Sequence, residues 1–460
     1  MKKIMLIACP LLATCLGIVL WQMGLTPAIA WTAGITVLVA GWWISEPIPI
    51  PATSLIPLAL FPLVGVLDAN QVGQAYGNKL VLLMLGGFML SAAMERSGAH
   101  QRIALGMVNL FGGGSARRLV FGFMAASAFL SMWISNAATT LMLLPIIMAI
   151  VAKTTNRRVH IALLLGVAYA ASVGGIGTPI GTPPNVVVMA VFQENIGAEI
   201  GFISWMSWAM PVVLIMLPIV GIWLTRGLGN IEPIKLPAVG KWRQEERLTL
   251  IVFAITAIFW VTRLQPFGGW TGLAANLGFP MPFANDAIVG LAGALALFVI
   301  PNGKGEKLLD WKTAENIPWG VLILFAGGIC IATAFKTSGL SELLGNGLAG
   351  LGQLPILLII GTICLSVTFL TEVTSNTATT TLLLPILVAA AITAEIDPKI
   401  FMVPATISAS FAFMLPVATP PNAIVFGSEK FSVRDMAREG IALNLIGVVV
   451  VTTVCWFMFG

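Results

Sequence analysis

Charged residues are scarce in this chain of 460 residues. Lysine, arginine, aspartate and glutamate make up only 9% of it, whereas 58% is hydrophobic and the mean hydropathy is +0.97. Soluble domains carry about 25% charged residues, because they need a polar surface to face water. The net charge of +5 is spread thinly over short segments, which excludes a disordered or nucleic-acid-binding protein. The composition therefore predicts a protein whose main solvent is lipid.

Residues that carry most enzyme chemistry are also few. The 5 cysteines lie inside apolar runs at unrelated spacings, so we expect neither a disulfide framework nor a zinc site. The 2 histidines, His100 and His160, lie beside Arg102 and Arg158, which argues against a histidine proton relay. The sequence contains no phosphate loop of the type GxxxxGK[ST] and no Ser/His/Asp constellation. We therefore expect neither an enzyme nor an ATP-driven pump.

Long apolar runs dominate the chain instead. Charged residues and Gly/Pro clusters divide them into eleven expected transmembrane helices. These are expected at 4–21, 27–45, 48–66, 79–98, 159–192, 204–226, 248–264, 283–301, 318–338, 400–428 and 441–459. Two further runs, 118–150 and 351–392, are too long for one crossing and carry polar clusters halfway, so each is predicted to be a re-entrant hairpin. The first run imitates a secretory signal, but it is long for one and we expect it to be retained.

The basic residues test this count of spans. With the N-terminus in the cytoplasm, 20 of the 24 Lys and Arg residues fall on the inner side. The outer side holds only Lys79, Arg263, Lys336 and Lys399. This asymmetry is the one that orients membrane proteins. We therefore expect a multi-pass protein of the plasma (inner) membrane with a cytoplasmic N-terminus and an external C-terminus.

The chain also repeats itself. Residues 135–146 recur as residues 375–386, and 9 of these 12 positions are identical. Gly-Thr-Pro-Pro-Asn at 181–185 recurs as Ala-Thr-Pro-Pro-Asn at 418–422. We therefore divide the chain into a first span (1–26), a first repeat (27–226), a cytoplasmic linker (227–247) and a second repeat (248–460). Each repeat has five spans, an odd number, so the second is inverted relative to the first; inverted repeats with interrupted helices are typical of secondary transporters.

The repeated motifs have a chemistry suited to ions. Ser and Asn are good helix N-caps, so each Ser-Asn motif predicts a half-helix whose positive dipole end faces the hairpin tip and favours an anion. The paired prolines break their apolar runs and release carbonyl oxygens, which suit a small cation such as Na⁺. Alternatively, these residues only cap and pack membrane helices, as Ser and Thr often do. The recurrence of both motifs at repeat-related positions favours binding.

With these motifs the sequence resembles a known family, the divalent anion:sodium symporters. The resemblance covers essentially the whole chain, including both hairpin tips and both Pro-Pro motifs. It implies one Na⁺ site at Ser131, Ser135, Asn136 and the backbone near Gly181, and a second at Thr371, Thr374, Asn376 and the backbone near Ala418. It implies a substrate site at Ser135, Asn136, Ala137, Thr182, Pro183, Asn376, Thr377, Thr419 and Pro420. It further implies homodimers in which a transport half moves as an elevator against a fixed scaffold.

Two residues of the hairpins, Ala137 and Glu372, could change binding at the tips. Ala137 stands where the family usually has Thr, so a hydroxyl donor is missing from the first tip, and the anion could be held less tightly or another anion preferred. Glu372 is the only charged residue between Leu354 and Ala391. It could tune the second cation site or act as a structural acceptor that fixes the hairpin.

The fold class expected is thus an all-α polytopic membrane protein with eleven transmembrane helices and two re-entrant hairpins in two inverted repeats. The function expected is sodium-coupled symport of a small divalent anion, most simply a C4-dicarboxylate such as succinate, malate or fumarate. A sodium-independent exchanger, an anion channel, or transport of citrate, tartrate or sulfate are the alternatives. The expected partners are the anion, sodium ions, the lipid bilayer and a second copy of the chain, without nucleic acid.

Overall fold

The computed structural model describes residues 2–111, 115–154, 156–228, 240–347 and 354–460. The regular elements of these residues are helices, apart from one isolated bridge between Pro301 and Lys307. The first half of the chain forms α1 (Lys2–Gln22), α2 (Pro27–Ser45), α3 (Ile50–Thr53), α4 (Ile56–Leu63), α5 (Ala69–Tyr76), α6 (Lys79–Ser97), α7 (Ala99–Phe111), α8 (Ala116–Ser131), α9 (Asn136–Val151), α10 (Arg157–Gly175), α11 (Pro183–Ile196) and α12 (Phe202–Thr225).

The second half forms α13 (Gln244–Val261), α14 (Gly269–Asn276), α15 (Asp286–Val299), α16 (Trp311–Ala314), α17 (Trp319–Ser338), α18 (Leu340–Gly347), α19 (Ile356–Thr371), α20 (Asn376–Thr393), α21 (Lys399–Ala409), α22 (Pro420–Phe426) and α23 (Val433–Phe459). Helices α8 and α9 occupy the predicted hairpin 118–150, and α19 and α20 occupy the described part of the predicted hairpin 351–392; residues 351–353 lie outside the described residues.

Among the described residues, 8 helical stretches are long and apolar enough to cross a membrane. They are Lys2–Gln22, Pro27–Ser45, Ala69–Ser97, Arg157–Gly175, Phe202–Thr225, Trp319–Ser338, Asn376–Thr393 and Val433–Phe459. Several other apolar helices are shorter, and they include α9, α15, α19 and α21. The all-helical architecture and these apolar helices confirm a polytopic membrane protein.

Three of the predicted spans are not continuous helices. The breaks in 159–192 and 400–428 were predicted from their paired prolines, whereas 48–66 was predicted as one span, and that prediction was wrong in this respect. The run 48–66 forms the short helices α3 and α4, because a proline-rich stretch cannot sustain one uninterrupted helix. The runs 159–192 and 400–428 are broken at 176–182 and 410–419. The predicted linker 227–247 also ends early, since α13 already begins at Gln244; residues 229–239 lie outside the described residues.

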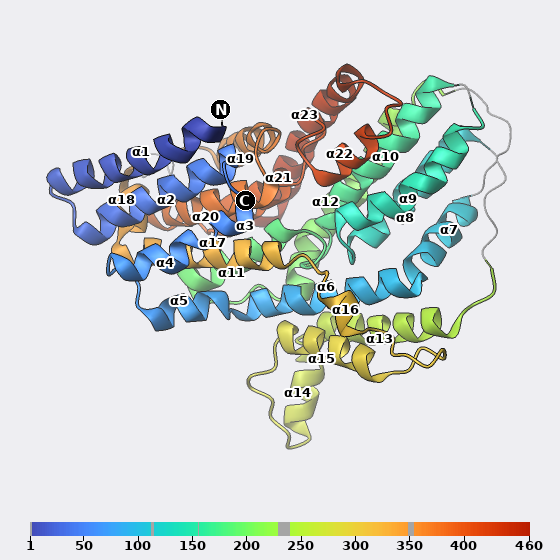
Figure 1. Ribbon diagram of the computed structural model, residues 1–460, viewed down its shortest axis with the longest axis horizontal. Helices are drawn as coiled ribbons and strands as arrows, with labels where there is room; N and C mark the ends of the chain where they lie inside the picture. Colours follow the sequence, from blue (N-terminus) through green and yellow to red (C-terminus); the bar gives the residue numbers. More distant parts are fainter. Residues whose placement is uncertain (1, 112–114, 155, 229–239, 348–353) are drawn as a thin grey trace.

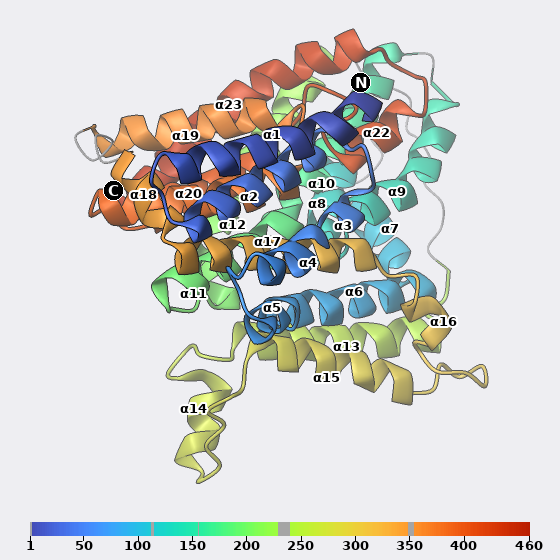
Figure 2. The same ribbon diagram turned by 60° about the vertical axis from the view of Figure 1, so that its left-hand side comes forward.

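The two halves of the chain interlock around their hairpins. Helix α9 of the first hairpin packs against α22 of the second half, and α20 of the second hairpin packs against α11 of the first half. Helices α13 and α15 lie beside α6 on one flank, while α14 projects away from all other helices (Figures 1 and 2). Each hairpin therefore contacts the short helix that follows the break in the opposite half.

Ion pairs join residues that the sequence places on the same side of the membrane. On the predicted inner side, Arg102 pairs with Glu246 at 2.7 Å. On the predicted outer side, Glu199 pairs with both Lys79, at 3.1 Å, and Arg263, at 2.6 Å. The predicted assignment of these loops to two faces is thus compatible with the packing.

Candidate functional site

The first hairpin tip is the turn between α8 and α9. Ser135 is the N-cap of α9, and its hydroxyl accepts a hydrogen bond from the backbone N–H of Ala138 at 3.2 Å. The hydroxyl of Ser131 donates to the side-chain oxygen of Asn136 at 2.5 Å. The polar ends of both helices are thereby tied together at the tip, with the N-terminal dipole of α9 directed at it.

The second tip, between α19 and α20, repeats the hydroxyl–asparagine contact, although the side chain of its N-cap Ser375 makes no capping hydrogen bond. The hydroxyl of Thr371 lies 2.7 Å from the side-chain oxygen of Asn376 and 3.0 Å from the carbonyl oxygen of Ala409. The hydroxyls of Thr374 and Thr379 are 2.6 Å apart. A hydroxyl–asparagine pair therefore closes both tips, with Ser131 in the first and Thr371 in the second.

The two breaks in the helices are also held alike. The side-chain amide of Asn185 donates to the carbonyl oxygens of Gly175, at 3.0 Å, and Thr178, at 2.7 Å. That of Asn422 donates to the corresponding carbonyls of Ala412, at 2.9 Å, and Leu415, at 3.0 Å. The side-chain oxygens of both asparagines are buried without a donor among the described residues. Each break is thus pinned by the Asn of its Thr-Pro-Pro-Asn motif.

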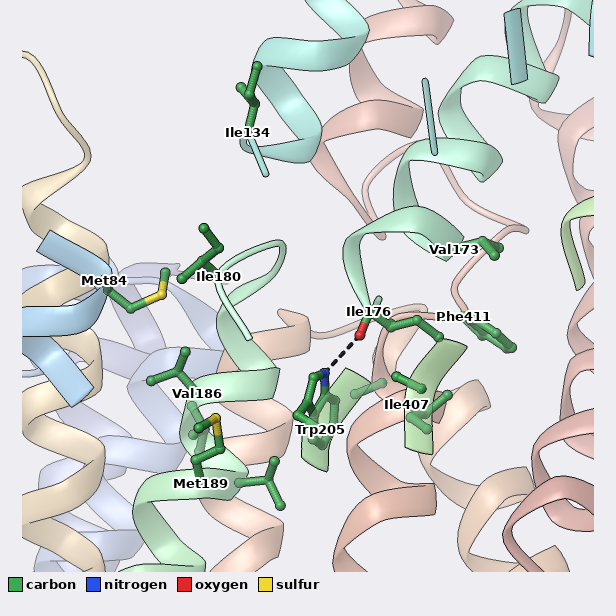
Figure 3. Packing of buried hydrophobic residues seen from close by; sticks show 14 of the residues in the cluster. Met84, Ile134, Val173, Ile176, Ile180, Val186, Met189, Trp205, Ile407 and Phe411 are labelled. Carbon is green, nitrogen blue, oxygen red and sulfur yellow. Dashed lines mark hydrogen bonds between the residues drawn. The ribbon is translucent and has the colours of Figure 1, made fainter. Parts of the chain in front are cut away.

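The last long helix of each half braces the break from outside. The indole N–H of Trp205 in α12 donates to the carbonyl oxygen of Ile176 at 2.8 Å, as Figure 3 shows. The side-chain oxygen of Asn444 in α23 accepts from the backbone N–H of Phe413 at 3.2 Å. Unwound backbone buried in this way would otherwise carry unpaired polar groups, which are costly at membrane depth.

Glu372 is buried and ties the second tip to the second break. Its two carboxylate oxygens accept from the backbone N–H groups of Met414, at 2.9 Å, and Leu415, at 3.0 Å. The side-chain amide of Asn444 donates to the same carboxylate at 2.6 Å. These contacts favour the structural interpretation of Glu372, as an acceptor that fixes the hairpin.

Oxygen atoms converge around Gly181. A Cβ built on this glycine would lie 2.9 Å from the carbonyl oxygen of Ser131 and 3.0 Å from that of Met132, and closer still to that of Gly175. The side-chain oxygen of Asn136 lies 2.6 Å from where a Cβ on Gly175 would be. Several uncharged oxygens in one small volume are the ligands preferred by hard cations.

Both tips and both Thr-Pro-Pro motifs line one cavity of about 620 Å³. The residues predicted for the substrate all contribute to its wall, namely Ser135, Asn136, Ala137, Thr182, Pro183, Asn376, Thr377, Thr419 and Pro420. Gly181, Thr374 and Ala418, predicted at the cation sites, line it too. Ser131 and Thr371 are fully buried behind the wall. The structure thus brings together the predicted residues of both halves, although they are far apart in sequence.

The described wall of this cavity holds no Lys, Arg or His side chain, and its one ionisable residue is Glu46. Glu46 follows α2, adopts a left-handed backbone conformation with φ of 44°, and lies 3.8 Å from the amine of Lys2. An anion in the cavity therefore has no basic partner on the described wall. Positive potential there comes from the N-termini of α9 and α20 and from any cation bound beside them.

A second cavity of about 660 Å³ adjoins the first and shares with it Phe88, Ser135, Ala137 and Pro318. Arg96 and Lys312, both predicted on the inner side, lie on its wall. The second cavity thus lies between the first hairpin tip and two basic residues of the predicted inner side.

The opposite wall of the central cavity was not predicted from the sequence. Trp43 and Ile44 at the end of α2, Phe88 in α6 and Val321 in α17 complete it. These residues lie on ordinary apolar helices without a distinctive motif, so nothing in the local sequence separates them from core or lipid-facing positions. Glu46 was a weak signal, as an acid directly before the proline-rich stretch.

Helical described residues with apolar spans, two broken helices and a cavity lined on one side by the polar hairpin tips have the architecture of a membrane transporter. The family described as the sodium:sulfate symporter transmembrane region matches residues 2–459, and the chain belongs to that family. This membership agrees with the expectation of a transporter and not of an enzyme.

Curated relatives agree with this assignment, and a solved structure shares the fold. The chain is 40% identical over 450 residues to the sodium-dependent dicarboxylate transporter SdcS of Staphylococcus saprophyticus, covering 92% of this chain and 85% of the relative. It is 37% identical over 449 residues to SdcS of Staphylococcus aureus, with the same coverage. The crystal structure of the YdaH transporter of Alcanivorax borkumensis aligns with a TM-score of 0.61 and 15% identity, covering 87% of this chain and 88% of that one. The last similarity concerns the fold alone.

Proposed function

We propose that this protein is a secondary transporter that uses an inward sodium gradient to import a small dicarboxylate, most simply a C4 compound such as succinate, malate or fumarate. The observation that carries the proposal is the convergence of both hairpin tips on one cavity whose described wall has no basic side chain. A divalent anion there needs compensating charge, and sodium ions bound at the tips would supply it.

The oxygen clusters behind the cavity support two sodium sites. The first would use Ser131, Ser135, Asn136 and the backbone near Gly181. The second would use Thr371, Thr374, Asn376 and the backbone near Ala418. The hydroxyl–asparagine pairs at 2.5 Å and 2.7 Å and the carbonyls around Gly181 are hard oxygen ligands of this kind. Each sodium ion would lie beside the anion, so that binding of one favours binding of the other.

The cavity also supports a dianion over more highly charged compounds. The substrate would contact Ser135, Asn136 and Ala137 at one tip, Asn376 and Thr377 at the other, and Thr182, Pro183, Thr419 and Pro420 on the walls. Glu46 on the opposite wall would repel a third carboxylate, because like charges in a confined site interact unfavourably. The curated relatives named as sodium-dependent dicarboxylate transporters favour the same substrate class.

The finer topology belongs to the same proposal. It comprises eleven spans and two re-entrant hairpins in inverted repeats 27–226 and 248–460, joined by the linker 227–247, with the N-terminus in the cytoplasm. The adjoining cavity toward Arg96 and Lys312 supports a conformation open to the inside. Transport would follow an elevator movement of the hairpins and broken helices, within a homodimer of the plasma membrane.

Uptake into proteoliposomes tests the proposal. Radiolabelled succinate should accumulate above its external concentration when sodium is high outside, and not when potassium replaces sodium. Malate and fumarate should compete more strongly than citrate, tartrate or sulfate. Equal succinate counterflow without sodium on either side would instead identify an exchanger, and succinate-dependent current without accumulation would identify a channel.

A further inference from the structure

A separate cavity of about 260 Å³ lies where α10 begins and α12 ends, beside the first turns of α23 (Figure 1). Its charged wall consists of Arg157, Arg158, Arg226, Arg438, Asp435 and Glu439. It shares no lining residue with the two cavities at the hairpin tips. The sequence places all of these residues on the inner face, next to the membrane surface.

The charges in this cavity do not cancel. Arg157 pairs with Asp435 at 2.6 Å, and Arg226 pairs with Glu439 at 2.6 Å. Arg158 and Arg438 form no ion pair within the part of the chain that the structure describes. Among the described residues, the charges of Arg158 and Arg438 therefore remain uncompensated in the cavity.

One arginine of the cavity, Arg226, is held in place by its neighbours, and Arg158 lies close to the end of the same helix. The guanidinium of Arg226 stacks on the ring of Trp223 at 3.9 Å and donates to its carbonyl oxygen at 2.5 Å. Arg158 lies so close to the turn after α12 that a Cβ on Gly227 would be 2.7 Å from its guanidinium. Guanidinium groups fixed in this way lose little conformational entropy on binding an anion.

The rest of the surroundings suits a lipid. Ile161 and Leu224 form the apolar part of the wall. Ile222, one turn before Arg226 on α12, is 65% exposed, as expected for a side chain that faces acyl chains. Phosphate is the anion that forked guanidinium donors recognise best. Basic cavities between transmembrane helices on the cytoplasmic side bind phospholipid headgroups. From this arrangement we infer that Arg158 and Arg438 bind the phosphate group of an anionic lipid of the inner leaflet.

Lipid-dependent thermal stability of the purified full-length protein tests this inference. In lipid-depleted detergent solution, phosphatidylglycerol should raise the unfolding temperature saturably, and phosphatidylcholine should not. In the double variant Arg158→Gln/Arg438→Gln, the concentration of phosphatidylglycerol for half the effect should rise about 25-fold, since each such charge contributes about fivefold. The double variant Arg117→Gln/Arg118→Gln removes the same charge elsewhere on the inner face and should behave like the unmodified protein.

Two results would overturn the inference. Equal loss of the lipid effect in both double variants would mean that the whole basic face attracts the bilayer without a defined site. Stabilisation by millimolar inorganic phosphate that equals the lipid effect and is lost in Arg158→Gln/Arg438→Gln would assign the site to a free anion. If the site variant does not fold, Arg158→Lys/Arg438→Lys keeps the charge but loses the fork, and should still weaken lipid binding. The readout does not depend on sodium or dicarboxylate, so it is independent of the transport proposal.

Discussion

The two hairpin tips face the same cavity but are anchored by different chemistry. At the first tip, the hydroxyl of Thr178 donates to the carbonyl oxygen of Met132. At the corresponding place in the second half, the carboxylate of Glu372 accepts from the backbone of Met414 and Leu415. The hydroxyl–asparagine pairs, Ser131–Asn136 and Thr371–Asn376, are nearly the same in both tips.

The two halves repeat the residues that border the cavity and differ in the anchors behind them. The hydroxyl–asparagine pairs and the pinned breaks are repeated, because in the proposed mechanism both determine where oxygens and N–H groups would meet an ion. The anchors behind them need only hold the tip in place, which either a neutral hydroxyl or a buried carboxylate can do when its partners are satisfied. A buried charge, however, makes the second tip more sensitive to change.

The largest loss of uptake is expected from the asparagines that the two tips share. Asn136→Ala or Asn376→Ala should each reduce sodium-driven uptake at least about 100-fold, because two or more polar contacts of about 1.5 kcal/mol are lost at once. Uptake in proteoliposomes measures this. Asn195→Ala is the control, since that amide donates only to the carbonyl oxygen of Val191 within its own helix. Normal uptake by both tip variants would contradict the assignment.

The two proposed cation sites differ by one methyl group, because Gly181 in the first corresponds to Ala418 in the second. Gly181→Ala should reduce uptake at least about tenfold, because the new Cβ meets fixed backbone oxygens that can move only at a cost of about 1–3 kcal/mol. The reciprocal change Ala418→Gly should leave uptake within about twofold, since a methyl is only removed there. Sodium dependence of initial rates measures both. Equal loss in the two variants would show that the sites are not distinguished in this way.

Glu372→Gln should have an intermediate effect. The glutamine amide has one acceptor where the carboxylate has two, so a backbone N–H of Met414 or Leu415 loses its partner at a cost of about 1–3 kcal/mol. We expect a lower unfolding temperature and a higher sodium concentration for half-maximal uptake. Glu342→Gln, an exposed acid in α18, is the matched control. An unchanged sodium dependence with lowered stability would leave Glu372 a purely structural role.

The smallest expected effect concerns the third position of each tip. Ala137→Thr should raise the affinity for succinate or change the anion preference, and Thr377→Ala should lower the affinity. Each change should be about 2–10-fold, the net worth of one hydrogen bond. Competition of succinate uptake by other anions measures both. Identical substrate profiles in both variants would mean that this hydroxyl has no part in binding.

The helix ends at the site could be predicted from the sequence because they depend on local chemistry. α9 and α20 begin at Asn136 and Asn376, directly after the Ser of each motif, as good N-caps require. α11 and α22 begin at the first proline of each Thr-Pro-Pro-Asn motif, where a missing N–H costs nothing. Because both motifs recur in the second repeat, the segments that became α9, α11, α20 and α22 were predicted to act together.

The partners of these segments could not be predicted, because they come from distant parts of the chain. Glu372 was recognisable as an isolated intramembrane acid, but its donor Asn444 lies 72 residues away. Phe88 and Val321 on the cavity wall are apolar residues in apolar helices, and periodicity does not distinguish a wall from a core position. The break of 48–66 into α3 and α4 likewise depends on which of several prolines ends the helix.

If both tips hold one anion together with sodium, succinate should protect cysteines placed at either tip from a thiol reagent. Ala137→Cys and Thr377→Cys would be introduced separately into protein whose 5 native cysteines are replaced by serine, and labelled with a water-soluble thiol reagent. Succinate should slow labelling at both positions by at least about fivefold in sodium and at neither position in potassium, because a bound ligand excludes the reagent from occupied sites. Leu141→Cys, on the wall of the adjoining cavity, should label at the same rate throughout. Protection at one tip only, or equal protection without sodium, would contradict the account.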